Sequence, residues 1–459
     1  MDTVDSATAS LAASEAVPSA ERLRRTWALA WPVIIAFSIE SIVGLADALM
    51  VGRLGPTAAA AVGVGVHILS AVNVAMFAVG VGALAVVARH VGAGETREAE
   101  QVLRQAIVAA IALAALVAAP VMCWAEPLLH VFRVEPAVVE TATRFVRLIM
   151  LGVPADAVVF VIASSLRAAG DTRTPLAIGM VVGVTNVAVA WVLIFGRFGF
   201  PALGVEGAAL GTVVAFSLGA LAGAVLLARG GLALRVRWPG TRIEPRTIAR
   251  ILRVGYPAAI EHLVMQVGFL SYMVFAARYG TAGVAAYFIG VRILALSFLP
   301  GFGFGAAAGT LVGQALGARR PDDAARSGWE ATALAIAFMT AGGVVLFAAA
   351  RPIAQLFVDD PAVIEASVAF IRVLAAAQPL MAIDFTLGGA LRGAGDTRFP
   401  LVVALLAFYG CRLGSSYVIT FALQLGLGWL WLTLVLDYLV RCVMKVWRFR
   451  SGAWSTARV

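Results

Sequence analysis

Acidic side chains inside apolar segments are the residues of this sequence best suited to chemistry. Glu40 and Asp47 lie in one long apolar run, and the spacing i, i+4 and i+7 places them with Gly44 on one face of a helix. Burial disfavours the charged form of a carboxylate, so that such a group binds and releases a proton near neutral pH. We therefore predict an ion-exchange site here. The alternatives are a structural hydrogen-bonding role for Glu40 and an interfacial position for Asp47.

The composition indicates that this run crosses a membrane. Of the 459 residues, 61% are hydrophobic and only 13% are charged, whereas soluble domains carry about 25% charged residues. A membrane span needs about 20 apolar residues, and the sequence offers twelve such runs between residues 27 and 447. We expect an all-α integral membrane protein. The sequence contains no HExxH, P-loop, GxSxG or CxxC pattern, so we expect no enzyme, no metal site and no cofactor.

The basic residues predict how the chain lies in the membrane. The net charge is +9, and the arginines are concentrated in short loops between apolar runs, which favours contact with anionic lipid over nucleic acid. If both termini are cytosolic, the cytosolic side holds 25 Arg and Lys residues against 8 on the opposite side. This asymmetry follows the positive-inside rule. We expect a monomeric multi-pass protein of a bacterial inner membrane, with both termini in the cytosol.

An internal repeat divides the twelve expected spans into two sets of six. A gapless alignment of the two halves places LRAAGDTRTPL, from Leu166 to Leu176, on LRGAGDTRFPL, from Leu391 to Leu401. The same register holds from about residue 31 to residue 176, which predicts a parallel repeat of a six-helix unit, an arrangement found in secondary transporters. The expected parts are a cytosolic tail (1–26), an N-terminal lobe (27–228), a basic linker (229–251), a C-terminal lobe (252–447) and a second tail (448–459).

Two features together resemble the multidrug and toxic compound extrusion (MATE) family. The first span contains Pro32 followed by Asp47 and the sequence VGRLG, and each half carries an RxAGDTRxP loop after its fourth span. The resemblance covers residues 27–440 and implies a V-shaped pair of six-helix bundles that exports cationic amphiphiles in exchange for H⁺ or Na⁺. It also implies that Asp47 binds the coupling ion, with Asn186 and Thr212 beside it.

The sequence departs from the family pattern at three positions. Ala190 stands where one branch has a second aspartate, which leaves the choice between H⁺ and Na⁺ open. Met265 and Met381 stand where another branch has the acidic residues of a cation site in the C-terminal lobe, so that site is expected to be absent.

Other polar and aromatic residues in apolar runs are candidates for a substrate cavity, with lobe packing as the alternative. Ionisable groups at membrane depth cost about 2.5–3.5 kcal/mol on insertion scales and therefore mark functional sites. These cavity candidates are Glu261, Gln266, Met265, Tyr272, Asp156 and Asp384. Arg292 and Arg412 are expected to be buried cations in structural ion pairs, with Asp384, Glu261 and Asp437 as candidate partners.

The repeated loops and prolines predict architecture and gating. Asp171 and Asp396 are expected to cap the helices that follow them, while Arg167, Arg173, Arg392 and Arg398 are expected to contact lipid headgroups on the cytosolic side. Pro32 and Pro257 occupy equivalent first spans and each removes one helical hydrogen bond. Bending at Pro32 would couple the ion site to the shape of the cavity, and a fixed packing kink is the alternative.

These observations predict a secondary antiporter that exports cationic or amphipathic small molecules in exchange for H⁺ or Na⁺. Acids outnumber bases at membrane depth, which favours a cationic cargo. A flippase for a lipid-linked precursor is the alternative within the same superfamily, and an intramembrane enzyme is the alternative from another class. No convergent nucleophile and base is visible for such an enzyme.

Overall fold

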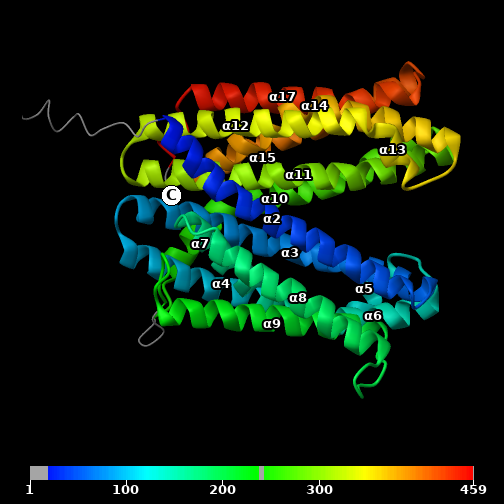
Figure 1. Ribbon diagram of the computed structural model, residues 1–459, viewed down its shortest axis with the longest axis horizontal. Helices are drawn as coiled ribbons and strands as arrows, with labels where there is room; N and C mark the ends of the chain where they lie inside the picture. Colours follow the sequence, from blue (N-terminus) through cyan, green and yellow to red (C-terminus); the bar gives the residue numbers. More distant parts are fainter. Residues whose placement is uncertain (1–18, 237–241, 458–459) are drawn as a thin grey trace, which may run out of the picture.

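The computed structural model describes residues 19–236 and 242–457, and the helices in this part of the chain form two bundles (Figure 1). The first half contains α2 (Ser19–Gly52), α3 (Pro56–Gly92), α4 (Thr96–Cys123), α5 (Ala125–His130), α6 (Pro136–Met150), α7 (Val153–Ala168), α8 (Arg173–Phe195) and α9 (Val205–Arg229). The second half contains α10 (Pro245–Ala277), α11 (Gly280–Gly317), α12 (Pro321–Ala348), α13 (Ala350–Gln355), α14 (Pro361–Ala394), α15 (Arg398–Ala404), η1 (Leu405–Leu413), α16 (Gly414–Tyr417), η2 (Val418–Ala422) and α17 (Leu427–Arg450).

The predicted all-α membrane architecture is confirmed. Within the described residues, 11 helices are long and apolar enough to cross a membrane, or 12 if α6 and α7 form one span bent by 48°. Pro154 lies in the first turn of α7, directly after that bend. The equivalent helix α14 is unbroken and carries Pro379 in its interior.

Several helices extend beyond the predicted spans. Helix α2 begins at Ser19 rather than at residue 27, and α10 begins at Pro245, inside the segment expected to be a linker. Proline suits the first turn of a helix because its missing N–H has no helical partner there. At its start α2 is held by a bidentate ion pair between Arg22 and Glu330 of α12, at 2.7 Å. The rest of the predicted N-terminal tail (1–18), residues 237–241 of the predicted linker and residues 458–459 lie outside the described part.

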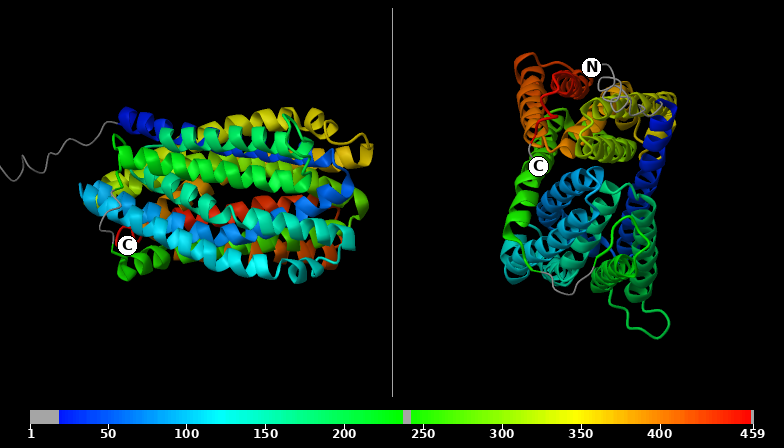
Figure 2. Two further views of the ribbon diagram at one scale, coloured as in Figure 1. Left: turned by 90° about the horizontal axis from the view of Figure 1, so that it is seen from below. Right: turned by 90° about the vertical axis from the view of Figure 1, so that its left-hand side faces the viewer.

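The first helix of each half joins the two bundles. Helix α2 packs against α8 of its own half and against α11 of the other, while α10 packs mainly against α3. Figure 2, right, shows α2 (dark blue) and α10 (green) on opposite sides of the molecule, each between the bundles. Pro32 and Pro257 are buried inside these two helices, neither of which is interrupted. A movement of one bundle against the other must therefore shift or bend both helices.

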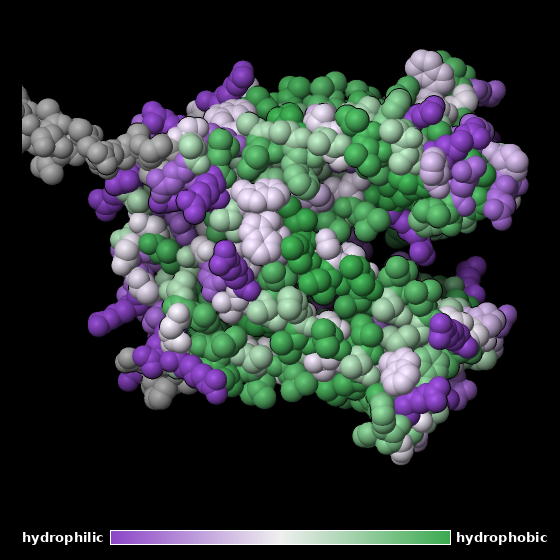
Figure 3. All heavy atoms as spheres, viewed as in Figure 1, coloured by the Kyte–Doolittle hydropathy of each residue, from purple (hydrophilic) through white to green (hydrophobic). Residues whose placement is uncertain are grey.

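Glycines bring the bundles together at one end. A Cβ atom on Gly92 would lie 1.9 Å from the carbonyl oxygen of Gln314, and one on Gly317 would lie 2.0 Å from that of Arg89. The register of the internal repeat relates the two contacts, and only glycine allows so close an approach. The bundles separate toward the opposite end, where the surface is hollowed between them (Figure 3). The chain thus forms a V that is closed where the last turns of α3 and α11 meet.

Candidate functional site

Asp47, Asn186 and Thr212 form a polar cluster where α2, α8 and α9 meet. The Nδ2 of Asn186 donates to Asp47 Oδ2 at 3.3 Å and to Thr212 Oγ1 at 3.4 Å. Thr212 in turn donates to the backbone oxygen of Ala208 at 3.2 Å. Gly183 permits the close packing of α8 on α2, because a Cβ there would lie 3.0 Å from a methyl group of Val43. The structure therefore brings together the three residues that the family resemblance had grouped.

Two oxygen atoms in this cluster have no hydrogen-bond partner within the described residues. These atoms, Asp47 Oδ1 and Asn186 Oδ1, are both buried. Buried polar atoms are nearly always hydrogen-bonded, so two orphaned acceptors on residues that contact each other indicate a site suited to a further proton or cation. A proton on Asp47 would supply the missing donor, and a small monovalent cation would accept electron pairs from both oxygens. The cluster therefore fits a coupling ion of either kind.

The missing second aspartate has a packing explanation. Ala190 is fully buried. A Cβ atom on Gly211 of α9 would lie 2.8 Å from both the backbone nitrogen and the methyl group of Ala190. The position is therefore a close contact between α8 and α9, and it leaves no room for a carboxylate.

Glu40 does not belong to the Asp47 cluster, although both lie on the same side of α2. Seven residues separate them along the helix, or about 10.5 Å, and Glu40 is exposed on α2 rather than packed into that cluster. Its electrostatic neighbours there are Arg167 and Asp156. Asp156 accepts a hydrogen bond from Asn73 of α3 at 3.3 Å. The N-terminal lobe thus holds two separate acidic groups along one face of α2.

The polar interior of the C-terminal lobe is arranged differently from the prediction. Asp384 is buried away from the cleft, where Lys445 Nζ contacts its carboxylate at 2.5 Å. Asp437 binds Arg441 at 2.7 Å and Arg412 at 3.7 Å, and all three side chains are at most 3% exposed. Asp384 is therefore a neutralised core residue and not a cavity residue. Arg412 is the buried cation that we expected, with Asp437 as its partner among the candidates.

Two further expectations are corrected by the side-chain positions. Tyr272 is fully buried, donates to the backbone oxygen of Leu430 at 2.6 Å and stacks on Arg412, so it belongs to the core and not to a cavity. Arg292 is exposed on α11 and makes no ion pair within the described part of the chain, so it is not a buried cation. Its apolar sequence neighbours predicted burial, but its side chain lies on the open face of the helix.

The remaining cavity candidates lie along α10. Glu261 forms an ion pair with Arg392 of α14 at 3.1 Å. His262 stacks on Phe77 of α3 with ring centroids 5.2 Å apart and hydrogen-bonds Gln266 at 3.2 Å. Met265, one residue before Gln266, contacts Arg441 through its sulfur atom at 3.1 Å. These residues thus connect the α3–α10 contact with the charged core of the C-terminal lobe.

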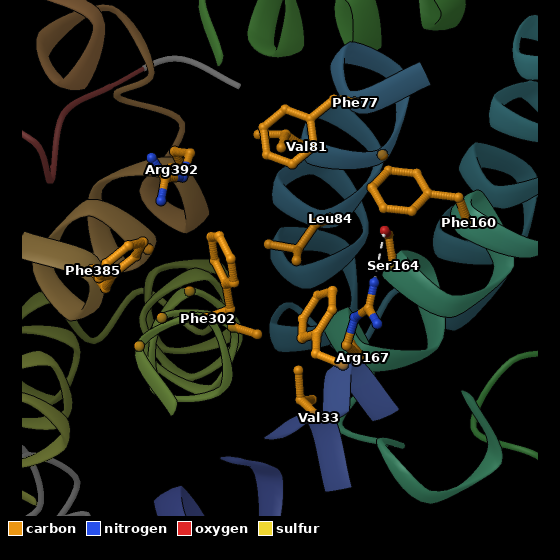
Figure 4. A pocket seen from close by; sticks show the side chains of 17 residues that line it. Val33, Phe77, Val81, Leu84, Phe160, Ser164, Arg167, Phe302, Phe385 and Arg392 are labelled. Carbon is orange, nitrogen blue, oxygen red and sulfur yellow. Dashed lines mark hydrogen bonds between the residues drawn. The ribbon is translucent and has the colours of Figure 1, made fainter. Parts of the chain in front are cut away.

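A pocket lies between the two lobes, at the closed end of the V (Figure 4). It is lined by side chains of α2, α3, α7, α11 and α14, which are mostly aromatic or small, together with Arg167 and Arg392. These two arginines face the pocket and not the lipid headgroups, which corrects our expectation for them. Arg173 and Arg398, in contrast, are exposed. The apolar pattern of α7 and α14 places an arginine near the end of each helix, but it does not reveal whether that side chain faces the pocket or the headgroups.

The repeated loops are held by the opposite lobe. Gln314 of α11 donates to the backbone oxygen of Ala168 at 2.8 Å, and Arg89 of α3 donates to that of Ala394 at 3.1 Å. Asp171 accepts from the backbone N–H of Thr174 at 3.0 Å, as predicted for a cap. Asp396 instead binds Arg448 at 2.8 Å, so the capping prediction is not met on that side. These contacts close the end of the V at which the loops lie.

Comparisons with known proteins agree with the repeat and the fold. The MatE family model matches twice, over residues 32–192 and 257–418, so that the two matches begin at the equivalent prolines Pro32 and Pro257. A probable multidrug resistance protein NorM of Thermotoga maritima is 30% identical over 94% of this chain and 93% of its own length. The multidrug resistance protein PmpM of Pseudomonas aeruginosa is 30% identical over 86% of this chain and 83% of its own.

Solved structures show the same fold. An outward-facing multidrug resistance MATE family transporter of the MOP superfamily superimposes with a TM-score of 0.88. It covers 94% of this chain and 96% of its own, at 21% sequence identity. The V of two bundles is thus a known arrangement of a chain of this length.

Proposed function

Because the chain belongs to the MATE family, we propose that it exports cationic or amphipathic small molecules in exchange for H⁺ or Na⁺ by alternating access. Asp47 is the ion-coupling residue, supported by Asn186 and Thr212. The observation that carries this proposal is the pair of orphaned acceptors, Asp47 Oδ1 and Asn186 Oδ1. Asp47 lies in α2, the helix that packs against both lobes. The protein works in a bacterial inner membrane with both termini in the cytosol.

The position of Asp47 on α2 gives a route from ion binding to movement. A proton or Na⁺ at Asp47 neutralises the carboxylate to which Asn186 of α8 donates and gives the orphaned oxygens a partner, so that it changes the contact between α2 and α8. The same helix packs on α11 of the other lobe. Ion binding therefore changes the free energy of the α2 contacts in both lobes at once, which favours one of the two arrangements of the lobes.

In the cycle that we propose, the cleft faces outward in this structure. Ion uptake at Asp47 weakens cargo binding and favours release to the outside. The lobes then rock, the contacts at Gly92 and Gly317 open, and the ion leaves to the cytosol before new cargo binds. One charge moving through 100 mV yields about 2.3 kcal/mol, and a tenfold ion gradient adds about 1.4 kcal/mol. Together they exceed the roughly 2.8 kcal/mol that a hundredfold gradient of a cargo without net charge requires. A monovalent cationic cargo cancels the electrical part of one entering ion, so its export to the same gradient requires more than one ion per cargo molecule.

The test is ethidium transport by the full chain in proteoliposomes, with a pH gradient or a Na⁺ gradient imposed separately. Transport under one gradient that is abolished in Asp47→Asn would support the proposal and identify the ion. Glu206→Gln, which changes a half-exposed carboxylate near the outer end of α9, is the matched control and should transport normally. Full transport by Asp47→Asn would overturn Asp47 as the coupling residue.

The flippase alternative has no specific observation in its favour. The matching family model is MatE, and the relatives described above are named as multidrug resistance proteins. We therefore retain the antiporter as the one proposed function.

A further inference from the structure

The pocket at the closed end of the V repeats the symmetry of the chain. The register of the internal repeat relates Arg167 to Arg392, Phe77 to Phe302 and Phe160 to Phe385, and all six residues line the pocket. The ring contacts repeat as well. Phe37 packs on Phe302 with centroids 5.5 Å apart, and His262, the repeat equivalent of Phe37, packs on Phe77 at 5.2 Å. The pocket is thus one site built equally from both lobes, on the pseudo-two-fold axis between them.

The pocket is lined by positive charges, whereas the acidic residues of the spans suggest a negative site. Among the described residues that line it, Arg167 and Arg392 are the only charged ones, and Ser164 is the only other polar one. Figure 4 shows the two arginines on opposite sides of the pocket, with phenylalanine rings between them. Glu40 and Glu261, the carboxylates nearest to the arginines in the structure, do not line the pocket. Two cations therefore face a largely aromatic space.

Both guanidinium groups keep hydrogen-bond donors available. Arg167 donates through Nη2 to Ser164 at 3.2 Å, and this is its only side-chain hydrogen bond in the described part of the chain. Arg392 contacts both oxygens of Glu261 through a single nitrogen, Nη1, at 3.1 and 3.3 Å. A guanidinium has five N–H donors, so several remain on each side chain. A planar anion with two oxygens matches this donor geometry better than a cation or a neutral group does.

The aromatic walls define the rest of the ligand. The absence of a side chain at Gly80 allows the Phe160 ring to lie against α3, since a Cβ at that position would meet the ring at 2.2 Å. Gly301 has the same relation to Phe385 on the other side, with the ring 2.7 Å from such an atom. Aromatic rings that line a pocket favour a flat aromatic ligand through offset or edge-to-face contacts.

We propose that this pocket binds the anionic group of an aromatic amphiphile, a carboxylate in the first instance, with Arg167 and Arg392 as its ligands. The proposal rests on the proposed export function and names the class of cargo that this pocket binds best: an aromatic acid or zwitterion binds here more tightly than a simple cation. In a zwitterion the anionic group lies between the arginines, and the cationic group points away from them. Because one arginine comes from each lobe, the anion holds both lobes together at the closed end.

The experiment measures equilibrium binding, which requires no ion gradient. The full chain in nanodiscs of zwitterionic lipid is titrated calorimetrically with 2-naphthoate, with 2-naphthamide and with 2-naphthylmethylammonium. We expect naphthoate to bind at least about tenfold more tightly than the amide, since a charge-assisted pair replaces a neutral hydrogen bond. Arg167→Gln and Arg392→Gln should each remove most of that preference, and Arg167→Lys should keep part of it.

Arg173→Gln and Arg398→Gln are the matched controls, because these exposed arginines are also related by the repeat and should leave the preference unchanged. Equal affinity of the wild type for naphthoate and the amide, or tighter binding of the ammonium probe, would overturn the proposal even if ethidium transport succeeds. Naphthoate preference without any gradient-driven transport would support this site while the coupling proposal fails. Displacement of naphthoate by phosphatidylglycerol in the nanodisc would make a lipid headgroup the occupant, which would overturn an aromatic cargo.

Discussion

The two lobes share a fold but treat their buried acids in opposite ways. In the N-terminal lobe, Asp47 and Asp156 each accept a hydrogen bond from a neutral amide, that of Asn186 and that of Asn73. In the C-terminal lobe, Asp384 and Asp437 contact cations supplied by the lobe itself. A carboxylate that is already paired with a cationic side chain is neutralised and does not require a bound ion. The comparison indicates that ion exchange belongs to the N-terminal lobe, while the charged core of the C-terminal lobe is permanently neutralised.

The fifth span of each lobe also differs between the two lobes. The span formed by α15, η1, α16 and η2 contains two stretches of π-helix, and the first carries the buried Arg412. A π-helical turn rotates the following residues relative to an α-helix and is common where side chains serve a special purpose. In the C-terminal lobe the π-helical stretch η1 contains Arg412, whose side chain lies between Asp437 and the Tyr272 ring. The N-terminal equivalent, α8, is a regular α-helix and carries Asn186.

The largest effect is expected from removing the internal cation of the C-terminal lobe. Lys445→Met leaves the Asp384 carboxylate buried without its partner, which costs about 3–5 kcal/mol for comparable buried pairs. Thermal unfolding of the purified protein in detergent should show a marked fall in Tm. The double variant Asp384→Leu, Lys445→Met should recover most of the loss, because no charge is then left buried. Asp47→Asn should leave Tm nearly unchanged, and a large fall there would contradict the proposed contrast between the lobes.

The next effect concerns the contact at which the lobes meet. Gly92→Ala and Gly317→Ala each place a methyl group about 2 Å from a carbonyl oxygen of the other lobe, so this end of the V cannot close as it does here. Overpacking of this kind costs about 1–3 kcal/mol. We expect the lobes to separate at this end, measured as a longer spin-label distance across the α3–α11 contact. Gly63→Ala, in the same helix α3 but with no atom within 4 Å of the new methyl group, controls for the effect of alanine on the helix alone.

The sequence predicted the repeat and the twelve spans because each leaves a pattern in the chain, whereas the grouping of Asp47 with Asn186 and Thr212 came from the family resemblance. Apolar run lengths report spans, and a shared register reports duplication. Lys445 was the residue that sequence reasoning missed as a partner of Asp384: the two are 61 residues apart, and only the packing of α17 on α14 brings them together. The pocket arginines were missed for a similar reason. The signal that would have found them is the joint repetition of Arg167, Phe77 and Phe160 in the same register.

A smaller effect is expected at the position where the family's second aspartate is replaced. Ala190→Asp would test whether a second carboxylate restores an ion site or only strains the packing. Because Ala190 contacts Gly211 so closely, we expect a loss of about 1–3 kcal/mol of stability by overpacking, and no gain in transport. Measured Tm and the ion dependence of ethidium transport distinguish the two results. Added Na⁺ dependence with an unchanged Tm would show that α8 and α9 can separate to admit the group.

The smallest effect is expected where the lobes are alike. Glu140 and Glu365 are related by the repeat, and each forms an exposed ion pair with an arginine, Arg144 in one lobe and Arg351 in the other. Exposed pairs of this kind contribute little, because water and salt screen them. Glu140→Gln and Glu365→Gln should therefore leave Tm and transport unchanged to the same degree. If one lobe were clearly more sensitive than the other, the asymmetry would extend to the surface, and the buried acids alone would no longer account for it.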